Sequence, residues 1–423
     1  MKKVLIISYY WPPGSGAGVQ RWVKLSKYLS DAGVETHVLT VNPEQASYPV
    51  RDESLLLEVG SRVILHLCDT REWFKAYAKI SGNEKIPFAG FAGEKKPGLF
   101  QYVSRFIRGN FFIPDPRRGW NQFALAKAIE IVEKFNIKTI VTTSPPHSTQ
   151  LVGLKLKEKL GIEWIADLRD PWTDIYYYKK FYHLAYARNL DRYYERKVLE
   201  TADRVLVVSK DIKRLFSGKS AKIDASKINV LPNGYDEADF QFQKKEKRSL
   251  SFSVAYIGTC TAEYPLDSFL PVVSEFSKLQ VMNLSFTGSV SHPELEKFSQ
   301  IPGVKLQLNG YVNHASAIAA MTEGSVLLLL IPETADNRGI LTGKLFEYLR
   351  SGSPVLGIGP VDGDASAILI ETGAGRMFAP KDTAGMIDFL SQVLQGKKQE
   401  RNLAAIENYS RETQARLIEK WIV

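Results

Sequence analysis

Short runs of apolar residues alternate with helical patterns along most of the chain, and this alternation restricts the possible folds more than any other feature. Buried strands that are separated by helices indicate a parallel sheet covered on both faces, which is a doubly wound α/β fold. The runs that we interpret as strands are 4–7, 34–41, 63–67, 139–143, 164–166, 205–208, 253–257, 283–287, 305–308, 326–330 and 354–358.

A charged stretch with little periodicity, residues 236–249, interrupts the alternation, which then begins again. We therefore expect two Rossmann-like domains, one over residues 1–238 and one over residues 239–400. Residues 401–423 carry apolar positions at helical spacing, so we expect one or two helices there.

Three observations predict a cytoplasmic protein. The longest unbroken apolar run, Val326 to Ile331, is far shorter than the roughly 20 residues that a membrane-spanning helix needs. Lys2 and Lys3 precede a short apolar run, whereas a secretory signal needs roughly 7–15 apolar residues. Cys68 and Cys260 lie far apart and predict neither a disulfide framework nor a zinc site.

The positive charge of the chain is concentrated in its first half. Residues 1–235 hold 37 basic and 24 acidic side chains, a balance of +13, whereas residues 236–423 hold 18 and 22, a balance of −4. Such an asymmetry indicates that the first half meets an anionic surface or ligand. Nucleic acid and anionic lipid both fit this charge, and composition alone does not separate them.

Residues 71–120 interrupt the alternation with many aromatic residues and with ten basic and four acidic side chains. Leu99 to Arg108 can form an amphipathic helix with Leu99, Tyr102, Val103 and Phe106 on one face and Arg105 and Arg108 on the other. Such a segment can lie at an anionic membrane surface. Alternatively, the segment is a helical insertion whose aromatic side chains complete the domain core.

A loop rich in proline and glycine follows the first strand and leads into a helix that begins near Val19. Gly16 and Gly18 allow a ligand to approach the backbone at the positive end of that helix, and Arg21 follows one turn later. The loop is too long for a dinucleotide fingerprint, and the second strand ends without the acidic residue that binds a ribose. NAD binding is therefore not expected.

Two further strands of the first domain end in polar residues, where open α/β sheets bind their ligands. His147 follows one strand and is either a site residue that donates a hydrogen bond or a structural, helix-capping histidine. Arg169 and Asp170 follow the next strand. Arg169 is suited to binding a phosphate and Asp170 to accepting a proton or a sugar hydroxyl, although a simple ion-pair cluster is the alternative.

The strongest signal in the second domain is a helix that begins at Thr342 and Gly343. Free amides at the start of a helix favour an anion, and Lys344 adds a full positive charge. Glu347, one turn later, is suited to accepting hydrogen bonds from a ribose diol. This pattern predicts a nucleoside diphosphate site, whereas an ordinary helix with a Lys344–Glu347 ion pair is the alternative.

The other polar loops give weaker signals. Gly258 and Thr259 end the first strand of the second domain in a small turn. Asp362-Gly363-Asp364 resembles the D-x-D that holds a divalent metal in some transferases, but a turn with a helix cap explains it better, so no metal site is expected.

The order and spacing of several motifs resemble those of family 4 glycosyltransferases of the GT-B type, in the branch that builds bacterial surface polysaccharides. The motifs are Tyr9-Tyr10-Trp11-Pro12-Pro13 with Gly18 and Arg21, Ile113-Pro114-Asp115-Pro116-Arg117 with Trp120, Ser144-Pro145-Pro146-His147, Asp167-Leu168-Arg169-Asp170-Pro171-Trp172, Leu231-Pro232-Asn233-Gly234, and Thr342-Gly343-Lys344-Leu345-Phe346-Glu347-Tyr348.

The resemblance implies an acceptor on the N-terminal domain and a nucleotide-sugar donor on the C-terminal domain, with the last helix crossing back to the first. It also implies transfer without a metal and with retention of configuration. The chain departs from the family in three places. Gly339 replaces the first glutamate of the E-x₇-E motif, Arg169-Asp170 replace a histidine, and no basic residue follows Gly258. Lys344, together with Arg338 or Arg169, would then have to neutralise the phosphate charge.

These observations together predict an enzyme that moves a sugar from a nucleoside diphosphate sugar, linked to UDP or GDP, to a lipid-linked or other glycan acceptor. It would need no cofactor, would bind no nucleic acid and would lie at the inner face of the membrane. Two alternatives stay open: a sugar-nucleotide epimerase of the same shape, and a non-catalytic homologue that acts as an interaction protein.

The site residues expected for the transferase fall into three groups. They are the catalytic candidates Arg169, Asp170 and His147, the acceptor-binding residues Gly16, Gly18 and Arg21, and the donor-binding residues Gly258, Thr259, Arg338, Thr342, Gly343, Lys344 and Glu347.

Overall fold

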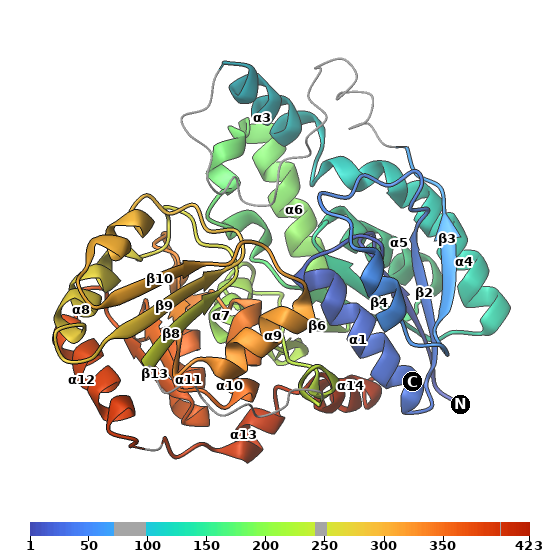
Figure 1. The fold of residues 1–423 in the computed structure, drawn as a ribbon. Helices are drawn as coiled ribbons and strands as arrows, with labels where there is room; N and C mark the ends of the chain where they lie inside the picture. The colour runs from blue at the N-terminus through green and yellow to red at the C-terminus, as the bar shows by residue number, and fades with distance from the viewer. Residues whose placement is uncertain (72–98, 242–251, 398) are drawn as a thin grey trace. The chain divides into compact units, whose positions relative to one another are not determined.

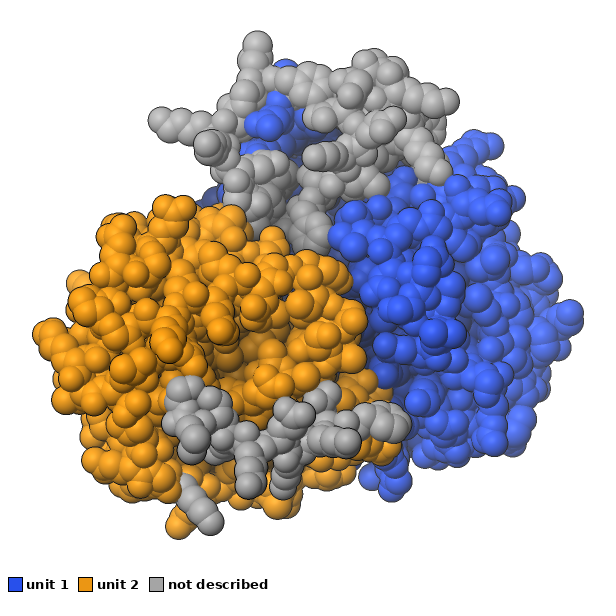
Figure 2. Space-filling view, in the orientation of Figure 1, with its two compact units in different colours: residues 1–232, 411–423 blue, residues 233–410 orange. Residues whose placement is uncertain are grey.

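The computed structural model describes residues 1–71, 99–241, 252–397 and 399–423. Within these residues the chain forms two compact units, residues 1–232 with 411–423 and residues 233–410 (Figure 2). The sequence placed the boundaries at 238 and 400 instead. Part of the aromatic segment that was predicted to lie at a membrane surface or to complete the core, from Trp73 to Phe91, lies outside the described residues.

The first unit is built on a parallel seven-stranded sheet with the order β3-β2-β1-β4-β5-β6-β7. Figure 1 labels β2, β3, β4 and β6 of this sheet. Its strands are β1 (Lys3–Ile7), β2 (Glu35–Val41), β3 (Ile64–Cys68), β4 (Thr139–Ser144), β5 (Glu163–Leu168), β6 (Arg204–Val207) and β7 (Ile228–Val230). Its α-helices are α1 (Ala17–Asp31), α3 (Leu99–Phe111), α4 (Asn121–Phe135), α5 (Ser148–Leu160), α6 (Ala185–Thr201), α7 (Lys210–Ser217) and α14 (Arg411–Glu419).

Alternate residues of each central strand enter different cores, because successive side chains of a strand point to opposite faces of the sheet. Leu5 and Ile7 of β1 lie in the core that α4 and α5 cover, whereas Val4 and Ile6 lie in the core beneath α1. Ala415 and Ile418 of α14 also belong to the second core, so the last helix packs beside α1 as expected.

The second unit repeats this plan with a parallel six-stranded sheet in the order β10-β9-β8-β11-β12-β13. Its strands are β8 (Phe252–Ile257), β9 (Met282–Thr287), β10 (Val304–Leu308), β11 (Val326–Leu330), β12 (Val355–Ile358) and β13 (Gly375–Phe378). Its α-helices are α8 (Leu270–Phe276), α9 (His314–Glu323), α10 (Gly343–Ser351), α11 (Asp364–Thr372), α12 (Thr383–Leu394) and α13 (Leu403–Glu407). The doubly wound α/β prediction is therefore confirmed for both units.

Short 3-10 helices connect several of these elements. They are η1 (Glu53–Glu58), η3 (Pro116–Trp120), η4 (Trp172–Asp174), η5 (Tyr178–Phe181), η6 (Ala225–Lys227), η7 (Glu237–Phe240), η8 (Asp267–Phe269), η9 (Leu295–Gln300) and η10 (Asn337–Gly339). In the described part of the chain, no helix has the length and apolar character that crossing a bilayer would require.

Candidate functional site

A cavity of about 410 Å³ lies in the first unit, at the carboxyl ends of β1, β4 and β5. The residues that follow each of these strands line it, and α3, η3, η5 and α6 supply the rest of the wall. This position is the one that an open parallel sheet offers to ligands, because loops diverge there.

The structure brings five of the sequence-predicted residues together in this cavity. Gly16, Gly18, His147, Arg169 and Asp170 all lie in its wall. Two glycines at the start of α1 thus share a cavity with the polar ends of β4 and β5, although 120 or more residues separate them in the chain.

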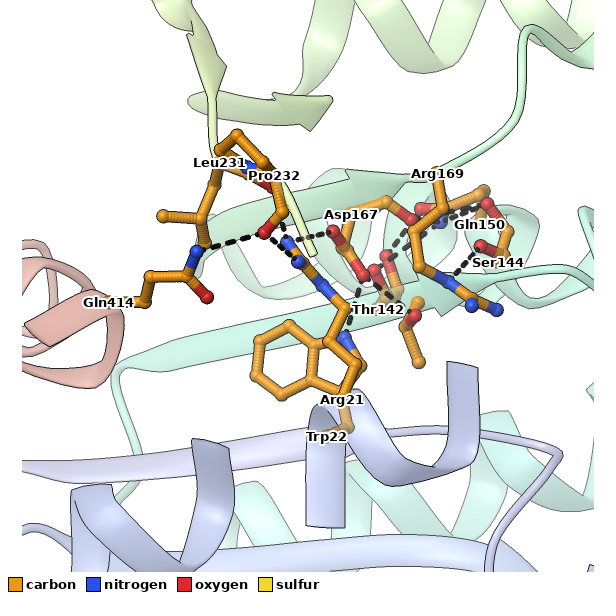
Figure 3. A network of polar contacts seen from close by, with 11 residues as sticks. Arg21, Trp22, Thr142, Ser144, Gln150, Asp167, Arg169, Leu231, Pro232 and Gln414 are labelled. Atoms are coloured by element: carbon orange, nitrogen blue, oxygen red, sulfur yellow. Dashed lines mark hydrogen bonds and ion pairs between the residues drawn. The ribbon is translucent and has the colours of Figure 1, made fainter. Parts of the chain in front are cut away.

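Arg21, the sixth residue predicted for this domain, is not part of the cavity wall and is only 2% exposed. It donates hydrogen bonds to the carbonyl oxygens of Leu231 and Pro232 and forms a 3.3 Å ion pair with Asp167 (Figure 3). Asp167 also accepts hydrogen bonds from Trp22 and Thr143. Arg21 therefore joins α1 to the segment after β7, and we correct the expectation that it faces an acceptor.

Arg169 lies against the start of α1. Its Nε donates to the carbonyl oxygen of Ser144 at 3.0 Å (Figure 3). A Cβ atom added to Gly18 would overlap the guanidinium group, so this position of Arg169 requires a glycine there. Of the ion-pair cluster that was the alternative for this segment, Asp167 pairs with Arg21, whereas no ion pair joins Arg169 to Asp170 among the described residues.

Burial shifts the pKa of both other catalytic candidates. Desolvation raises the pKa of Asp170, and the charge of Arg169 opposes that rise. Desolvation, assisted by Arg169, lowers the pKa of His147 to about 3, so this imidazole is neutral at physiological pH. The ring of His147 stacks on Trp172 with centroids 4.7 Å apart. His147 does not cap α5, since its side chain makes no capping hydrogen bond and Asp115 binds the amide of Ser148 instead.

Asp191 of α6 holds the aromatic side of the cavity in place. It is 2% exposed and accepts hydrogen bonds from Trp172 Nε1 at 2.9 Å and from the Tyr178 hydroxyl at 2.8 Å. Desolvation raises the pKa of Asp191 to about 7. Tyr178 in turn stacks on His183, with ring centroids 4.2 Å apart.

No feature of the sequence assigned Asp115, Arg117 or Arg108 to the site, yet all three line the cavity. Asp115 and Arg117 belong to the Pro114–Arg117 motif, which was quoted for its resemblance but given no role. Arg108 was placed on the polar face of an amphipathic helix. Only the folded structure shows that these three residues line the same cavity as Arg169, because they are distant from it in the sequence.

The start of α10 carries a cluster of polar groups in the second unit. Thr342 occupies the N-cap position without a capping side-chain hydrogen bond, and its Oγ1 is buried without a partner among the described residues. Lys344 lies in the first turn, and its Nζ donates to the Tyr256 hydroxyl at 2.6 Å. Desolvation lowers the pKa of Lys344 to about 7.

The end of β8 lies directly beside this helix start. Gly258 has φ 124°, and a Cβ there would come within 3.0 Å of Lys344 Nζ. The Tyr348 hydroxyl accepts a hydrogen bond from the amide of Ile257, which fixes α10 against β8. The Tyr256 hydroxyl donates to the carbonyl oxygen of Thr259. Gly258 is thus adjacent to Lys344 at the start of α10, and the donor site stays a prediction.

Glu347 lies one turn beyond Lys344, and no ion pair joins these two described residues. His314 of α9 lies 3.8 Å from the Glu347 carboxylate and 3.1 Å from that of Asp239. His314 was not identified from the sequence, where nothing but its position before a helix marks it.

Arg338 lies in η10, which ends shortly before this helix. It forms a 2.8 Å ion pair with Asp362, and both side chains are more than half exposed. Among the described residues, no group of three or more His, Cys, Asp or Glu side chains is arranged to hold a metal ion.

The comparisons with known proteins agree with this architecture. Residues 88–239 match the model of Glycosyltransferase Family 4. No curated protein matches the chain significantly.

Solved structures match the chain over almost its entire length. Sucrose-phosphate synthase from Thermosynechococcus elongatus has a TM-score of 0.62 at 14% identity, with 99% of this chain and 98% of that one covered. Anabaena HepE in complex with UDP has a TM-score of 0.61 at 12% identity, with the same coverage. The lipopolysaccharide outer core galactosyltransferase WaaB has a TM-score of 0.57 at 12% identity, again with 99% and 98% covered.

At these identities the structural matches establish the fold alone, and the family model matches less than half of the chain. The two doubly wound units agree with that fold. The chain has the GT-B fold, and its segment 88–239 is similar to Glycosyltransferase Family 4.

Proposed function

We propose that the enzyme transfers a sugar from a nucleoside diphosphate sugar, bound by the second unit, to a glycan acceptor bound in the cavity of the first. The observation that supports this most directly is the start of α10, where Lys344 and an uncapped N-terminus offer positive charge to a diphosphate. Glu347 follows on the same helix and would hold the ribose diol. UDP is the expected nucleotide, because HepE was solved with it.

The rate would come mainly from positioning and from stabilisation of the leaving diphosphate. Lys344 and the amides near Gly343 would carry that charge without a metal. His147 is neutral at physiological pH and would bind a sugar hydroxyl rather than move a proton. Asp170, whose pKa burial raises, would accept a hydroxyl of the acceptor or steady a developing positive charge. Retention of configuration is expected for this arrangement.

Glu347→Ala tests the donor assignment. Loss of two charge-assisted hydrogen bonds should weaken UDP binding by about tenfold or more. Isothermal titration calorimetry with UDP and GDP measures this, and Glu371→Ala, which changes an exposed glutamate on α11, is the matched control. Unchanged UDP affinity in the Glu347 variant would contradict the assignment.

We further propose that the acceptor is lipid-linked, in surface polysaccharide synthesis, and that the enzyme meets an anionic membrane. Helix α3 supports this, because part of its apolar face is exposed: Tyr102 and Val103 are 44% and 45% exposed, Phe106 is half-buried, and Arg105 is 8% exposed. A helix that completes a core would show the opposite pattern. The galactosyltransferase WaaB, with the same fold, is named for lipopolysaccharide.

Neighbouring elements extend this exposed surface. The Tyr182 ring packs on Tyr102 with centroids 4.5 Å apart, and Leu184 and Tyr186 are 56% and 76% exposed. Three exposed arginines follow at four-residue spacing along α6: Arg188, Arg192 and Arg196. Aromatic residues beside arginines suit a layer of anionic headgroups.

Flotation with vesicles tests the membrane proposal. The wild type should float with vesicles that contain phosphatidylglycerol and not with neutral phosphatidylcholine vesicles. Leu184→Ser together with Tyr186→Ser should reduce flotation, whereas Leu403→Ser, at a 73% exposed leucine of α13, should not. Equal flotation of both variants, or none by the wild type, would contradict it.

Sugar transfer itself is tested by incubation with UDP-sugars in the presence and absence of a lipid extract that supplies acceptors. A product that forms only with the extract indicates transfer. Conversion of the donor without any acceptor would indicate an epimerase instead.

A further inference from the structure

Arg169 holds unused hydrogen-bond donors inside the cavity of the first unit. Its Nε is bonded to Ser144, but neither Nη atom forms a hydrogen bond to another described residue. Both Nη atoms are directed to the space that a side chain at Gly18 would fill, at the first turn of α1. The guanidinium group is always protonated in proteins, so these donors carry a full charge.

The first turn of α1 is itself positive and uncapped. Gly16, at the N-cap position, offers no side chain, and no acidic residue lies in the first turn. By contrast, Asp115 binds the amide of Ser148 and caps α5 on the same cavity wall. A guanidinium beside a bare helix N-terminus brings two positive ends together, which is unfavourable unless an anion lies between them.

Arg108 of α3 supplies a second guanidinium to the same wall. It lies 4.9 Å from the centroid of the Phe181 ring and forms no hydrogen bond or ion pair with another described residue. Tyr177 also lines the cavity, where burial raises its pKa, the charge of Asp170 adds to that rise and the charge of Arg108 opposes it.

The carboxylates of the cavity do not balance both of these charges. Asp170, which follows Arg169 in the chain, accepts no side-chain hydrogen bond from another described residue and offsets at most one of the two guanidinium charges. Asp115 uses its oxygens on Ser148 and on the amide of Arg117, and Asp191 uses both oxygens on Trp172 and Tyr178. Arg117 donates to the carbonyl oxygen of Ser47. Arg108 and Arg169 are therefore the two lining cations whose donors are left for a ligand.

We infer that Arg108, Arg169 and the amino end of α1 form an anion subsite that receives a phosphate group carried by the acceptor. This inference rests on the proposed function, because it assigns the cavity to the acceptor. It defines the acceptor class as a sugar bearing a phosphate, and Arg108 becomes a substrate-binding residue. Bidentate guanidinium contacts suit phosphate oxygens in particular.

Calorimetry on the full chain tests the subsite with N-acetylglucosamine 1-phosphate as the probe and N-acetylglucosamine as the neutral comparison. The donor site is first saturated with UDP, so that phosphate binding at α10 does not contribute. The sugar phosphate should bind at least tenfold more tightly than the neutral sugar, and the difference should shrink at high salt. Equal affinities would overturn the inference without any variant.

Two substitutions locate the binding. Arg108→Gln and Arg169→Gln should each weaken sugar-phosphate binding about tenfold or more, while Arg118→Gln, which removes an exposed charge of η3, should not. Thermal melting shows which variants fold. If one of the two arginine variants does not fold, the sugar-phosphate affinity of the other variant tests the inference. Equal effects of the Arg108 and Arg118 substitutions would overturn the inference.

Lys344→Ala separates the acceptor phosphate from the donor diphosphate. This variant should lose UDP affinity and keep its affinity for the sugar phosphate, and a parallel loss of both would overturn the assignment to the first unit. Sugar transfer without preferential sugar-phosphate binding would refute only the subsite. Preferential binding without any transfer would refute only the proposed function.

Discussion

Substitution of Gly18 by alanine should separate stability from function, because the two respond to it in opposite directions. Gly18 is the second residue of α1 and has no positive φ, so alanine fits the backbone. Alanine in a helix is favoured over glycine by up to about 1 kcal/mol, and about half of that is expected in the first turn. The free energy of unfolding should therefore stay the same or rise slightly.

The added Cβ would occupy the place of the Arg169 guanidinium. The atoms displaced belong to the far end of a flexible side chain, so the protein can accommodate them at small cost by moving Arg169. Moving it forfeits charge-assisted hydrogen bonds to the acceptor worth about 1.5–3 kcal/mol, which corresponds to a roughly 10- to 150-fold loss in acceptor affinity.

Two assays check this prediction. Urea denaturation measures the free energy of unfolding, and sugar transfer at varied acceptor concentration measures kcat/KM. Gly218→Ala is the control, since a Cβ there meets only ordinary contacts and φ is −82°. The reasoning fails if Gly18→Ala keeps wild-type kcat/KM, or if it destabilises the protein by more than about 1 kcal/mol.

Three further predictions concern buried charges. Lys344, with a pKa of about 7, must be protonated to hold a diphosphate, so the UDP affinity measured by calorimetry should fall as pH rises from 7.5 to 9. Lys344→Arg should remove this pH dependence, because arginine stays protonated. The same pH dependence of UDP affinity in the variant would contradict the prediction. The pKa of Asp191 is raised to about 7, above its value of roughly 3.9 in the unfolded chain. The protonated side chain therefore contributes its full stability below pH 4, and this contribution is lost as pH rises through 7. Asp191→Asn should make the free energy of unfolding less dependent on pH between 5 and 7. Asp167→Ala leaves Arg21 buried without its ion-pair partner and should cost about 3–5 kcal/mol in urea denaturation. Asp31→Ala, at an exposed aspartate of the same unit, should not reproduce this loss.

The α/β class was readable from the sequence because β1, β11 and their neighbours are continuous apolar runs, which only strands covered on both faces require. β7 and β13 were missed because they contain three and four residues and include polar side chains. Neither has a periodicity long enough to distinguish a strand from a loop.

The polar cluster at the start of α10 was also readable, because Thr342 to Glu347 are consecutive and the geometry of one helix places them. Their interaction with Tyr256 depends on the pairing of distant strands, and the sequence contained no sign of it.

Arg21 shows the opposite case. As a charged residue one turn into a helix beside a glycine-rich loop, it had the local features of a ligand-binding side chain. Its burial against Asp167, Leu231 and Pro232 comes from three segments that meet only in the folded unit.

Most strands and helices, and the residues that are neighbours along one helix or at one strand end, could be predicted from local sequence, since backbone geometry and hydrophobic periodicity act over short distances. Which charged side chains are already hydrogen-bonded and which keep donors for a ligand depends on contacts that form only in the folded unit. Arg21, Arg108 and Arg169 are chemically identical, and what distinguishes them is whether a carbonyl or carboxylate from a distant segment reaches their donors.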